Sequence, residues 1–385
     1  MSDTIEKSQS LLSNVWIELK AERLLQNLQM IRESAGLQNE VMAVIKANGY
    51  GHGLHQVART LDGHVLYLGV SSIKEALELK ELNLKSRIFL FGRLFRQEIG
   101  AVLSSSASEL TSQPAANDIT LSVSSLTEAE DIASVAQSFN KTAKVHIKID
   151  TGMGRMGIPL DRALADIEKI SKMQALEIEG IYSHFPTAET ADVFRDQQTR
   201  DFNLLAKALE LKKIFIRFKH LQNSAACFSF KPQGVNLIRP GLALYGISGE
   251  PERKLQPVLA LKAKVIHVKR LSPGASAGYG RQFTAEKATT IGVIPVGYSQ
   301  GYSYAAWKKG QILFQGKRFP LAGRISMDYM TINFGNQYLK PGDTVTLIGE
   351  DGGDCITANE VAHWAGTIPY EIITALQYYL PRVTV

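Results

Sequence analysis

Cysteine is scarce in this chain. Only Cys227 and Cys355 occur among 385 residues, and neither has a His or Cys neighbour at the spacing of metal ligands. A disulfide framework, a zinc site or another metal site is therefore not expected. The sequence also lacks any run near the roughly 18 apolar residues that span a membrane, and its N-terminal segment has no signal-peptide core. These absences predict a cytoplasmic protein without a membrane partner.

A basic stripe is absent as well. Lysine and arginine number 43 against 37 aspartates and glutamates, a net charge of +6, but the two signs are interleaved along the chain. Because nucleic-acid-binding proteins gather positive charge on one face, no nucleic-acid partner is expected. A mildly basic surface suits small anionic ligands.

The length and the apolar segments predict an α/β fold with two domains. A chain of 385 residues fits a barrel of about 250 residues plus a domain of about 100 or more. Strand-like apolar runs alternate with helical patterns, which is typical of a (β/α)8 barrel. The eight expected strands are 41–45, 67–70, 87–91, 119–123, 144–149, 177–183, 216–221 and 235–238. The barrel is expected over residues 1–257.

Beyond residue 257 the pattern changes to short β-rich segments, which predicts a mainly-β C-terminal domain over 258–385. Its expected strands are 258–271, 289–296, 311–314, 330–334 and 344–348, followed by a helical segment at 357–380. At the other end, a strand at 16–19 and a helix at 21–32 are expected. The first 14 or so residues are expected to be extended or to pack on the second domain.

The segment AVIKANGYGHG, residues 43–53, carries the first chemical signal. An apolar strand ends on Lys46, and a glycine-rich loop follows. The carboxyl ends of barrel strands form the rim where such folds bind ligands. A lysine there suits a phosphate anchor or a Schiff-base former, and a strand-end lysine that simply reaches water is the plain alternative.

Polar side chains follow several other expected strands at the same rim. They are Asp150, Arg155, His184, Asn223, Ser224 and Arg239. Each has a structural alternative, such as a turn cap for Asp150, a buried core histidine for His184 and a helix cap for Ser224. Together with Lys46 they predict one site. The loops with Ser224 and with Gly241 offer a hydroxyl and backbone N–H groups for a phosphate.

The Lys46 segment resembles the cofactor-lysine motif of the alanine racemases, a family of barrel-type (fold type III) enzymes that depend on pyridoxal 5'-phosphate (PLP). The likeness continues through almost the whole chain. It implies that Lys46 binds PLP covalently and that the enzyme interconverts L- and D-alanine, supplying D-alanine for peptidoglycan. The resemblance assigns PLP binding to Lys46, Tyr50, Arg155, His184, Asn223, Ser224, Arg239, Gly241, Leu242 and Tyr370.

The second domain carries further family motifs, AGYGRQF with Tyr279, PVGY with Tyr298, and GRISMD with Met327. The resemblance implies a homodimer with shared active sites, in which the partner subunit supplies Tyr279. Lys46 is then the base for D-alanine and Tyr279 the base for L-alanine. The resemblance also places His184 beside that tyrosine and links it to Arg239. These two residues complete the catalytic set.

Substrate contacts are implied for Arg155, Tyr298 and Met327. Several family members hold the arginine with a carbamylated lysine two residues before the aspartate of DTGMGR, which here is Lys148. Its carbamylation is a hypothesis from position alone. The family's usual acid is replaced by Gln300 and its frequent cysteine by Ser326, which leaves a broader serine and alanine racemase open. A PLP-dependent decarboxylase of the same fold and a cofactor-free barrel lyase are further alternatives.

Overall fold

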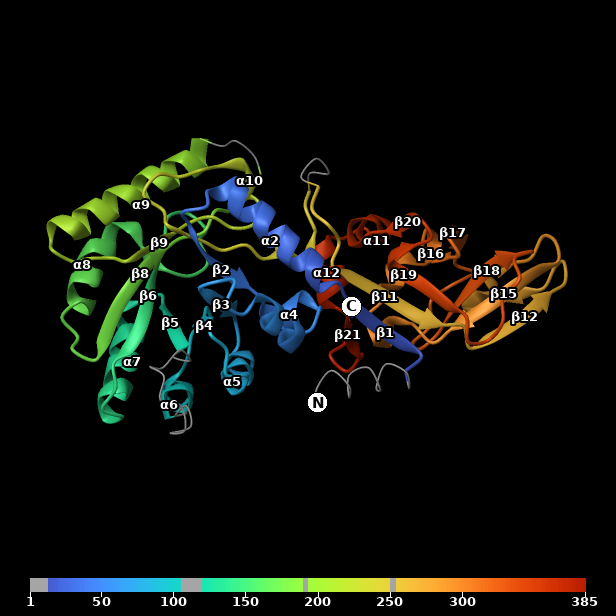
Figure 1. The fold of residues 1–385 in the computed structure, drawn as a ribbon, viewed down its shortest axis with the longest axis horizontal. Coiled ribbons are helices and arrows are strands. Elements are labelled where there is room, and N and C mark those ends of the chain that lie inside the picture. The colour runs from blue at the N-terminus through green and yellow to red at the C-terminus, as the bar shows by residue number, and fades with distance from the viewer. Residues whose placement is uncertain (1–12, 105–118, 190–192, 250–253) are drawn as a thin grey trace.

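The computed structural model describes residues 13–104, 119–189, 193–249 and 254–385, so the expectation for the first residues lies mostly outside the described part. The described chain forms two bodies side by side (Figure 1), a barrel with outer helices and a mainly-β domain. Within these ranges no helix is both long and apolar enough to cross a membrane.

Eight parallel strands form the barrel in the order β10-β2-β3-β4-β5-β6-β8-β9. They are β2 (Glu40–Val44), β3 (Tyr67–Val70), β4 (Arg87–Leu90), β5 (Ile119–Val123), β6 (Ala143–Asp150), β8 (Leu176–Tyr182), β9 (Phe218–His220) and β10 (Leu237–Ile238), with the short β7 (Ile158–Pro159) beside β6. Strands buried along their whole length, such as β3 and β5, need cover on both faces. The (β/α)8 prediction is confirmed.

Backbone hydrogen bonds close the barrel between β9 and β10, the two ends of this strand order. The Asn236 N–H donates to the Lys219 carbonyl over 3.1 Å, and the Arg239 N–H donates to the Gln222 carbonyl over 3.0 Å. The second bond fixes Arg239 at the end of β10 beside the loop that follows β9.

Helices cover the outside of the strands (Figure 1). They are α2 (Ala21–Ala35), α4 (Leu54–Leu61), α5 (Ile73–Glu81), α6 (Arg96–Ser104), α7 (Leu126–Ser138), α8 (Leu160–Ile170), α9 (Val193–Leu211) and α10 (Ala226–Ser229). The short segment α3 (Lys46–Tyr50) follows β2 at the rim and contains left-handed rather than helical residues. Ser72 and Ser125 cap α5 and α7 by accepting hydrogen bonds from the N–H of Glu75 and Glu128, the capping-box spacing.

The barrel interior is filled mainly by aromatic side chains. Six residues from six different strands form a cluster separate from the main core, namely Met42, Tyr67, Phe89, Tyr182, Phe218 and Leu237. The main core lies between the strands and the outer helices, where it includes neighbours such as Val41 and Leu68, and it continues into the second domain. This alternation is expected of barrel strands, whose successive side chains point in and out.

The second domain is built around a sheet in the order β17-β16-β19-β11-β1-β21. Its strands are β1 (Val15–Leu19), β11 (Leu259–Lys264), β16 (Gln311–Phe314), β17 (Lys317–Pro320), β19 (Thr344–Asp351), β20 (Asp354–Ile356) beside β19, and β21 (Arg382–Thr384). A second sheet holds β12 (His267–Leu271), β15 (Thr289–Ile294) and β18 (Met330–Gly335), and a small hairpin holds β13 (Ser276–Ala277) and β14 (Phe283–Thr284).

Assigning residues 15–19 to the barrel was wrong. Strand β1 pairs antiparallel with β11 and parallel with β21 in the second domain. Its alternating buried residues, Val15, Ile17 and Leu19, face that domain's core. The chain therefore crosses from the second domain into the barrel at Lys20.

Two other expectations for the second domain are refined. The strand expected over 258–271 is two strands, β11 and β12, which belong to different sheets. The segment 357–380 contains two short helices, α11 (Ala358–Ala365) and α12 (Pro369–Thr374), because Gly366 ends the first in the left-handed region and Pro369 starts the second.

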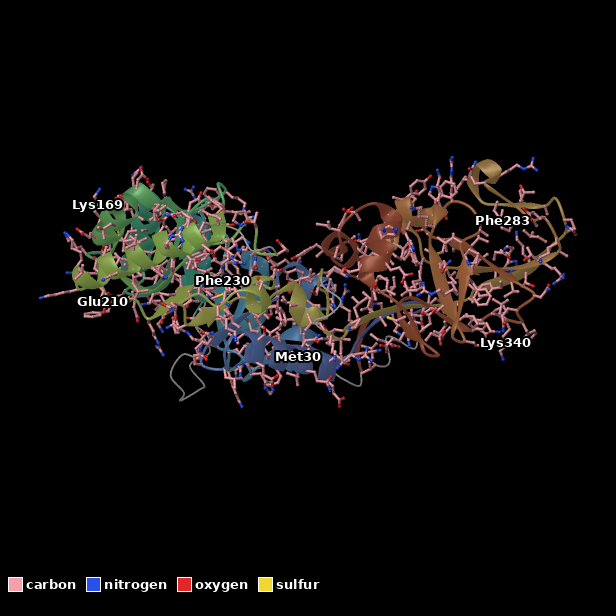
Figure 2. The ribbon with its side chains drawn as sticks, turned by 90° about the horizontal axis from the view of Figure 1, so that it is seen from above. Met30, Lys169, Glu210, Phe230, Phe283 and Lys340 are labelled. Carbon is pink, nitrogen blue, oxygen red and sulfur yellow. The ribbon has the colours of Figure 1, made fainter. Side chains whose placement is uncertain are left out.

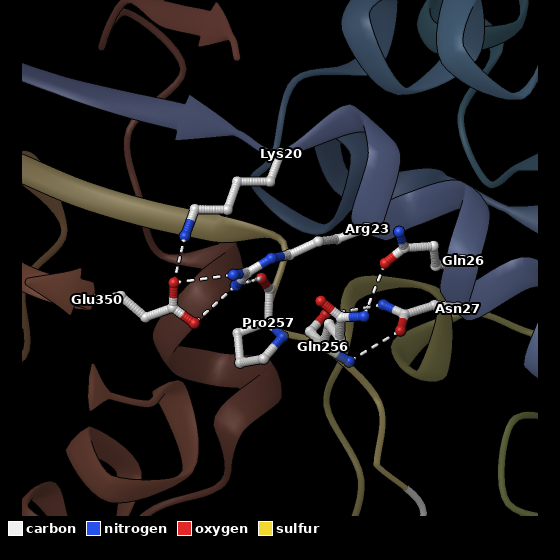
Figure 3. A network of polar contacts seen from close by, with 7 residues as sticks. All are labelled: Lys20, Arg23, Gln26, Asn27, Gln256, Pro257 and Glu350. Atoms are coloured by element: carbon white, nitrogen blue, oxygen red, sulfur yellow. Dashed lines mark hydrogen bonds and ion pairs between the residues drawn. The ribbon is translucent and has the colours of Figure 1, made fainter. Parts of the chain in front are cut away.

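Polar contacts tie the two bodies together where β1 leads into α2 (Figure 3). The Glu350 carboxylate accepts hydrogen bonds from Lys20 and from both terminal nitrogens of Arg23, all within 2.9 Å. Asn27 is fully buried and makes three hydrogen bonds, to the backbone N–H and carbonyl of Gln256 and to the Leu244 carbonyl. These contacts fix the start of α2 against the crossing segment.

Candidate active site

A cavity of about 400 Å³ lies at the carboxyl ends of the barrel strands. Eleven of the residues predicted for the site line it together: Lys46, Tyr50, Lys148, Arg155, His184, Asn223, Ser224, Arg239, Gly241, Leu242 and Tyr370. Tyr370 comes from α12 of the second domain, so both bodies contribute walls.

Lys46 is followed by an unusual turn. Five consecutive residues, Ala47 to Gly51, have φ between +51° and +81°, the left-handed region. This conformation costs roughly 1–2 kcal/mol for each residue with a side chain. Three of the five residues carry that cost, so the surrounding structure must hold the turn in place.

Hydrogen bonds from several elements hold this turn. The Asn48 N–H donates to Glu75 Oε1 over 3.0 Å, and Asn48 Oδ1 accepts from the Leu54 N–H over 2.8 Å. Within the turn, the Gly51 N–H donates to the Ala47 carbonyl over 2.9 Å. The turn thus joins Lys46 to Tyr50, and both residues line the cavity.

Burial lowers the pKa of the Lys46 amine, and the nearby Arg155 cation lowers it further, while the Glu75 carboxylate opposes both. A lowered pKa increases the fraction of neutral amine, which is the nucleophilic form. Lys46 is therefore suited to forming a Schiff base.

Arg239 is buried and held rigidly. Its Nη2 donates to the carbonyl oxygens of Ser183 and Leu221 over 2.6 and 3.1 Å, and its Nη1 donates to His220 Nδ1 over 3.0 Å. Burial lowers the pKa of Arg239 to about 10, which leaves it a cation at neutral pH. The histidine bonded to Arg239 is thus His220, whereas the resemblance named His184.

Two further titratable groups face the cavity. Burial, reinforced by Arg239 and Lys148, lowers the pKa of His184 to about 3, so this imidazole is neutral at physiological pH. Burial, with Arg155 and Arg239, lowers the pKa of Lys148 to about 8. The Lys148 amine lies 5.9 Å from the centre of the Tyr182 ring. An anion bound in the cavity would therefore lie near the positive charges of Arg155 and Arg239, which line it.

The far wall forms a cradle suited to an oxyanion. Ser224 Oγ accepts hydrogen bonds from the N–H groups of Gly241 and Ala243 over 2.9 and 3.2 Å. A Cβ at Gly241 would lie 2.6 Å from Tyr50 Oη, so only glycine leaves that hydroxyl in place. Hydroxyls and backbone N–H groups beside a short helix, η1 (Leu242–Tyr245), are the donors that phosphates use.

One of the structural alternatives weighed from the sequence also occurs. Asp150 caps its turn by accepting hydrogen bonds from the N–H groups of Gly152 and Gly154. The helix cap considered for Ser224 is made by its neighbour instead, because Asn223 Oδ1 accepts from the Ala226 N–H over 3.1 Å at the start of α10. Asn223 also lines the cavity.

Three predicted site residues lie away from this cavity. Tyr279 in η3 (Tyr279–Arg281), Tyr298 and Met327 belong to the second domain, with exposed fractions of 70%, 50% and 57%. Phe283, four residues after Tyr279, lies at the end of the domain away from the barrel (Figure 2). A single chain therefore does not bring Tyr279 to its own cavity.

Sequence reasoning missed His220 and Tyr182. Tyr182 lines the cavity, and its ring stacks on the His220 imidazole at 4.7 Å with an angle of 10°. The available signal was position, because both are the last residues of strands β8 and β9 and precede rim residues that were predicted.

Comparison with known proteins places the whole chain in one family. The model of the alanine racemase N-terminal domain matches residues 19–249, and that of the C-terminal domain matches residues 258–384. The alanine racemase of Desulforamulus reducens is 37% identical over 378 residues, which cover 96% of this chain and 98% of the relative. That of Methanococcus maripaludis is 35% identical with the same coverage.

Solved structures agree along the same length. An alanine racemase from Clostridium difficile 630 superposes with a TM-score of 0.89 at 30% identity, covering 97% of this chain and 96% of that one. The alanine racemase from Bacillus anthracis with bound L-Ala-P gives a TM-score of 0.85 at 30% identity, covering 97% and 95%. The family matches, the relatives and the shared fold together show that this chain belongs to the alanine racemase family.

Proposed function

We propose that this protein interconverts L- and D-alanine with PLP bound at Lys46. The observation that carries the proposal is a partly buried amine of lowered pKa that shares one cavity with an oxyanion cradle at Ser224 and Gly241. The relatives and solved structures named above, which are called alanine racemases, support the same substrate.

The lining residues fit this cofactor. Lys46 would bind its aldehyde, and Ser224, Tyr50, Tyr370 and the backbone at Gly241 and Leu242 would hold its phosphate. Asn223 and His184 complete the set. When bound, PLP acts as an electron sink that delocalises the charge left when the α-proton of the amino acid is removed.

Racemisation needs a base on each face of the α-carbon, because one proton leaves and another must arrive from the opposite side. We assign the D-face to Lys46 and the L-face to Tyr279 of a partner subunit. Arg239 stays a cation and therefore disfavours a second positive charge beside it. Arg155 would orient the substrate carboxylate, with Tyr298 and Met327 closing the substrate side.

The shared site can be tested with mixed dimers. Lys46→Ala should abolish turnover in both directions, and Tyr279→Phe should suppress the reaction of L-alanine. If the two variants are unfolded together, refolded and mixed, half of the dimers are hybrids with one complete site each. We then expect about a quarter of the wild-type activity to return with L-alanine. No recovery, with hybrids present by native mass spectrometry, would rule out a tyrosine supplied by the partner.

Carbamylation of Lys148 belongs to the same proposal. A pKa of about 8 leaves an appreciable neutral fraction of this amine near neutral pH, and the neutral amine is the form that adds CO₂. The carbamate would give Arg155 an anionic partner. Protein in ¹³C-bicarbonate should show a carbamate carbonyl resonance that Lys148→Met removes. A spectrum without this resonance would exclude the modification.

The substrate range is tested by chiral chromatography of products from purified protein, PLP and a panel of L-amino acids. D-alanine as the main product supports the proposal, comparable D-serine indicates the broader racemase, and release of CO₂ indicates the decarboxylase. A cytoplasmic role in supplying D-alanine for peptidoglycan, and a domain boundary near residue 257, stay parts of this proposal.

A further inference from the structure

A row of buried polar side chains crosses the barrel interior away from the active site. His220 Nδ1 lies 3.0 Å from Arg239 Nη1, and His220 Nε2 lies 2.8 Å from His146 Nδ1. His146 Nε2 lies 4.0 Å from Glu179 Oε2. All four residues are at most 5% exposed. The active-site arginine is thus connected to a carboxylate deep in the barrel.

Hydrogen-bond chemistry gives this row a direction. A guanidinium only donates, so His220 Nδ1 must accept, and its proton must be on Nε2. That Nε2–H then donates to His146 Nδ1, which places the proton of His146 on Nε2 as well. The Nε2 of His146 makes no hydrogen bond within the described residues. The Glu179 carboxylate nearby favours a proton at that position.

Other residues hold Glu179 in place. Its Oε2 accepts hydrogen bonds from Arg87 Nη2 over 2.6 Å and from the Tyr67 hydroxyl over 3.0 Å. Arg87 is the first residue of β4, at the end of the barrel opposite the active site. The row therefore runs from Glu179, which Arg87 holds near the amino-terminal ends of the strands, to Arg239 at the rim that forms the active site.

The backbone makes room for the central histidine. A Cβ at Gly180 would lie 2.7 Å from His146 Nδ1, so the imidazole occupies the space that any other residue would fill. The pairing of β6 with β8 also shifts register between Val145 and His146. Such irregularities re-aim side chains in barrels.

We propose that His146 and Glu179 are positioning residues, which hold Arg239 in its orientation at the active site through His220. Because His146 and His220 are both neutral with the proton on Nε2, His220 presents only its Nδ1 acceptor to the Arg239 guanidinium. Neither imidazole places a positive charge beside it. The assignment of the row rests on the contacts above. Its effect on catalysis rests on the proposed function, in which Arg239 acts beside PLP.

Three variants test this role. Gly180→Ala changes no charged group and should displace His146 by steric contact. Glu179→Gln keeps the side-chain shape but removes the charge. Glu177→Gln makes the same change two residues earlier on β8, where the side chain is exposed, and is the matched control. If Gly180→Ala does not fold, Glu179→Gln still carries the test.

The first readout needs neither PLP nor activity. Nitrogen-15 NMR of histidine-labelled protein without cofactor should show His146 and His220 as single Nε2–H tautomers in the wild type and in Glu177→Gln. In Gly180→Ala and Glu179→Gln these signals should shift to mixed or reversed tautomers. Unchanged tautomers in both variants would overturn the proposal, even if the protein proves not to be a racemase.

The second readout is steady-state kinetics of the PLP-loaded enzyme. We expect kcat for L-alanine to fall at least about tenfold in the two row variants, with KM changed much less, because the substrate contacts remain. Glu177→Gln should retain the wild-type kcat. Altered tautomers with a wild-type kcat would overturn the positioning role and leave the racemase activity standing.

Discussion

Arg382 Nε donates a hydrogen bond to the Gly51 carbonyl over 3.0 Å. This contact joins β21 of the second domain to the left-handed turn that follows Lys46. The Arg382 Nη1 atom also donates to the carbonyls of Gln377, Tyr378 and Leu380, so the guanidinium is fixed in place. The turn beside the proposed catalytic lysine is therefore held from the second domain, and the barrel alone does not account for its conformation.

Gly51→Ala should disrupt this arrangement. A Cβ at Gly51 would lie 1.9 Å from the Ile373 carbonyl, and the φ of +81° disfavours any side chain. Since left-handed strain and the displacement of α12 add, we expect a loss of about 3 kcal/mol or more in unfolding free energy. Urea unfolding measures it. Gly249→Ala is the control, because its Cβ would meet nothing within 4 Å. Equal stability of the two variants would contradict the role of the second domain.

Lys46 should respond in opposite directions to its two charged neighbours. Glu75→Gln removes the group that raises its pKa and should lower that pKa further, whereas Arg155→Gln should raise it. The pH dependence of reductive methylation of Lys46, followed by peptide mass spectrometry on protein without PLP, measures both shifts. Glu78→Gln is the control, since that carboxylate pairs with Lys74 and His55 instead. Shifts of the same sign in the two variants would contradict the electrostatic account.

Acid should unfold the protein steeply. Burial lowers the pKa of His52, His146 and His184 to about 3, and that of His220 well below its usual value. Below about pH 6.5 these histidines gain protons only on unfolding, so stability falls as the pH falls. Four such groups cost about 5 kcal/mol for each pH unit, which predicts acid unfolding at about pH 5 for a protein of ordinary stability.

Unfolding free energy measured against pH by urea titration checks this slope. His52→Gln should reduce it by about a quarter, or about 1.4 kcal/mol per pH unit. His363→Gln, which removes an exposed histidine, should leave it unchanged. A slope that does not change with His52→Gln would show that other groups cause the acid sensitivity.

The polar contacts around the start of α2 should differ widely in strength. Asn27→Ala leaves buried groups of Gln256 and Leu244 without partners and should cost about 3 kcal/mol. Glu350→Gln breaks ion pairs of a side chain that is 41% exposed, and should cost under about 1 kcal/mol. Urea unfolding at pH 7 compares them. A larger loss for Glu350→Gln would contradict this ranking of the buried and the exposed contact.

Much of the barrel could be predicted because its strands are short apolar runs that end at polar residues. The expected strands at 67–70 and 119–123 coincide with β3 and β5. The rule that barrels bind ligands at the carboxyl ends of their strands also predicted one shared site for Lys46 and Arg239, which are distant in sequence and do line one cavity. Their roles stay predictions.

Other features depend on pairing that no local pattern encodes. The alternation in β1 shows that one face is buried, but it does not say which domain buries it. The bond between Arg239 and His220 likewise requires the alignment of the loop after β9 with β10. The exposed position of Tyr279 in the second domain likewise depends on how distant segments pack, and no local pattern encodes it.

The position of β1 also bears on how the protein is made. Strand β1 leaves the ribosome about 240 residues before its partner β11 and about 365 residues before β21, a delay of roughly 20 to 70 seconds for β21 at ordinary translation rates. During that time Val15, Ile17 and Leu19 have no sheet to join, while the barrel strands that follow can already pair. Newborn chains therefore carry an unsatisfied apolar edge at their leading end, and chaperones or premature contacts between neighbouring chains would act there first.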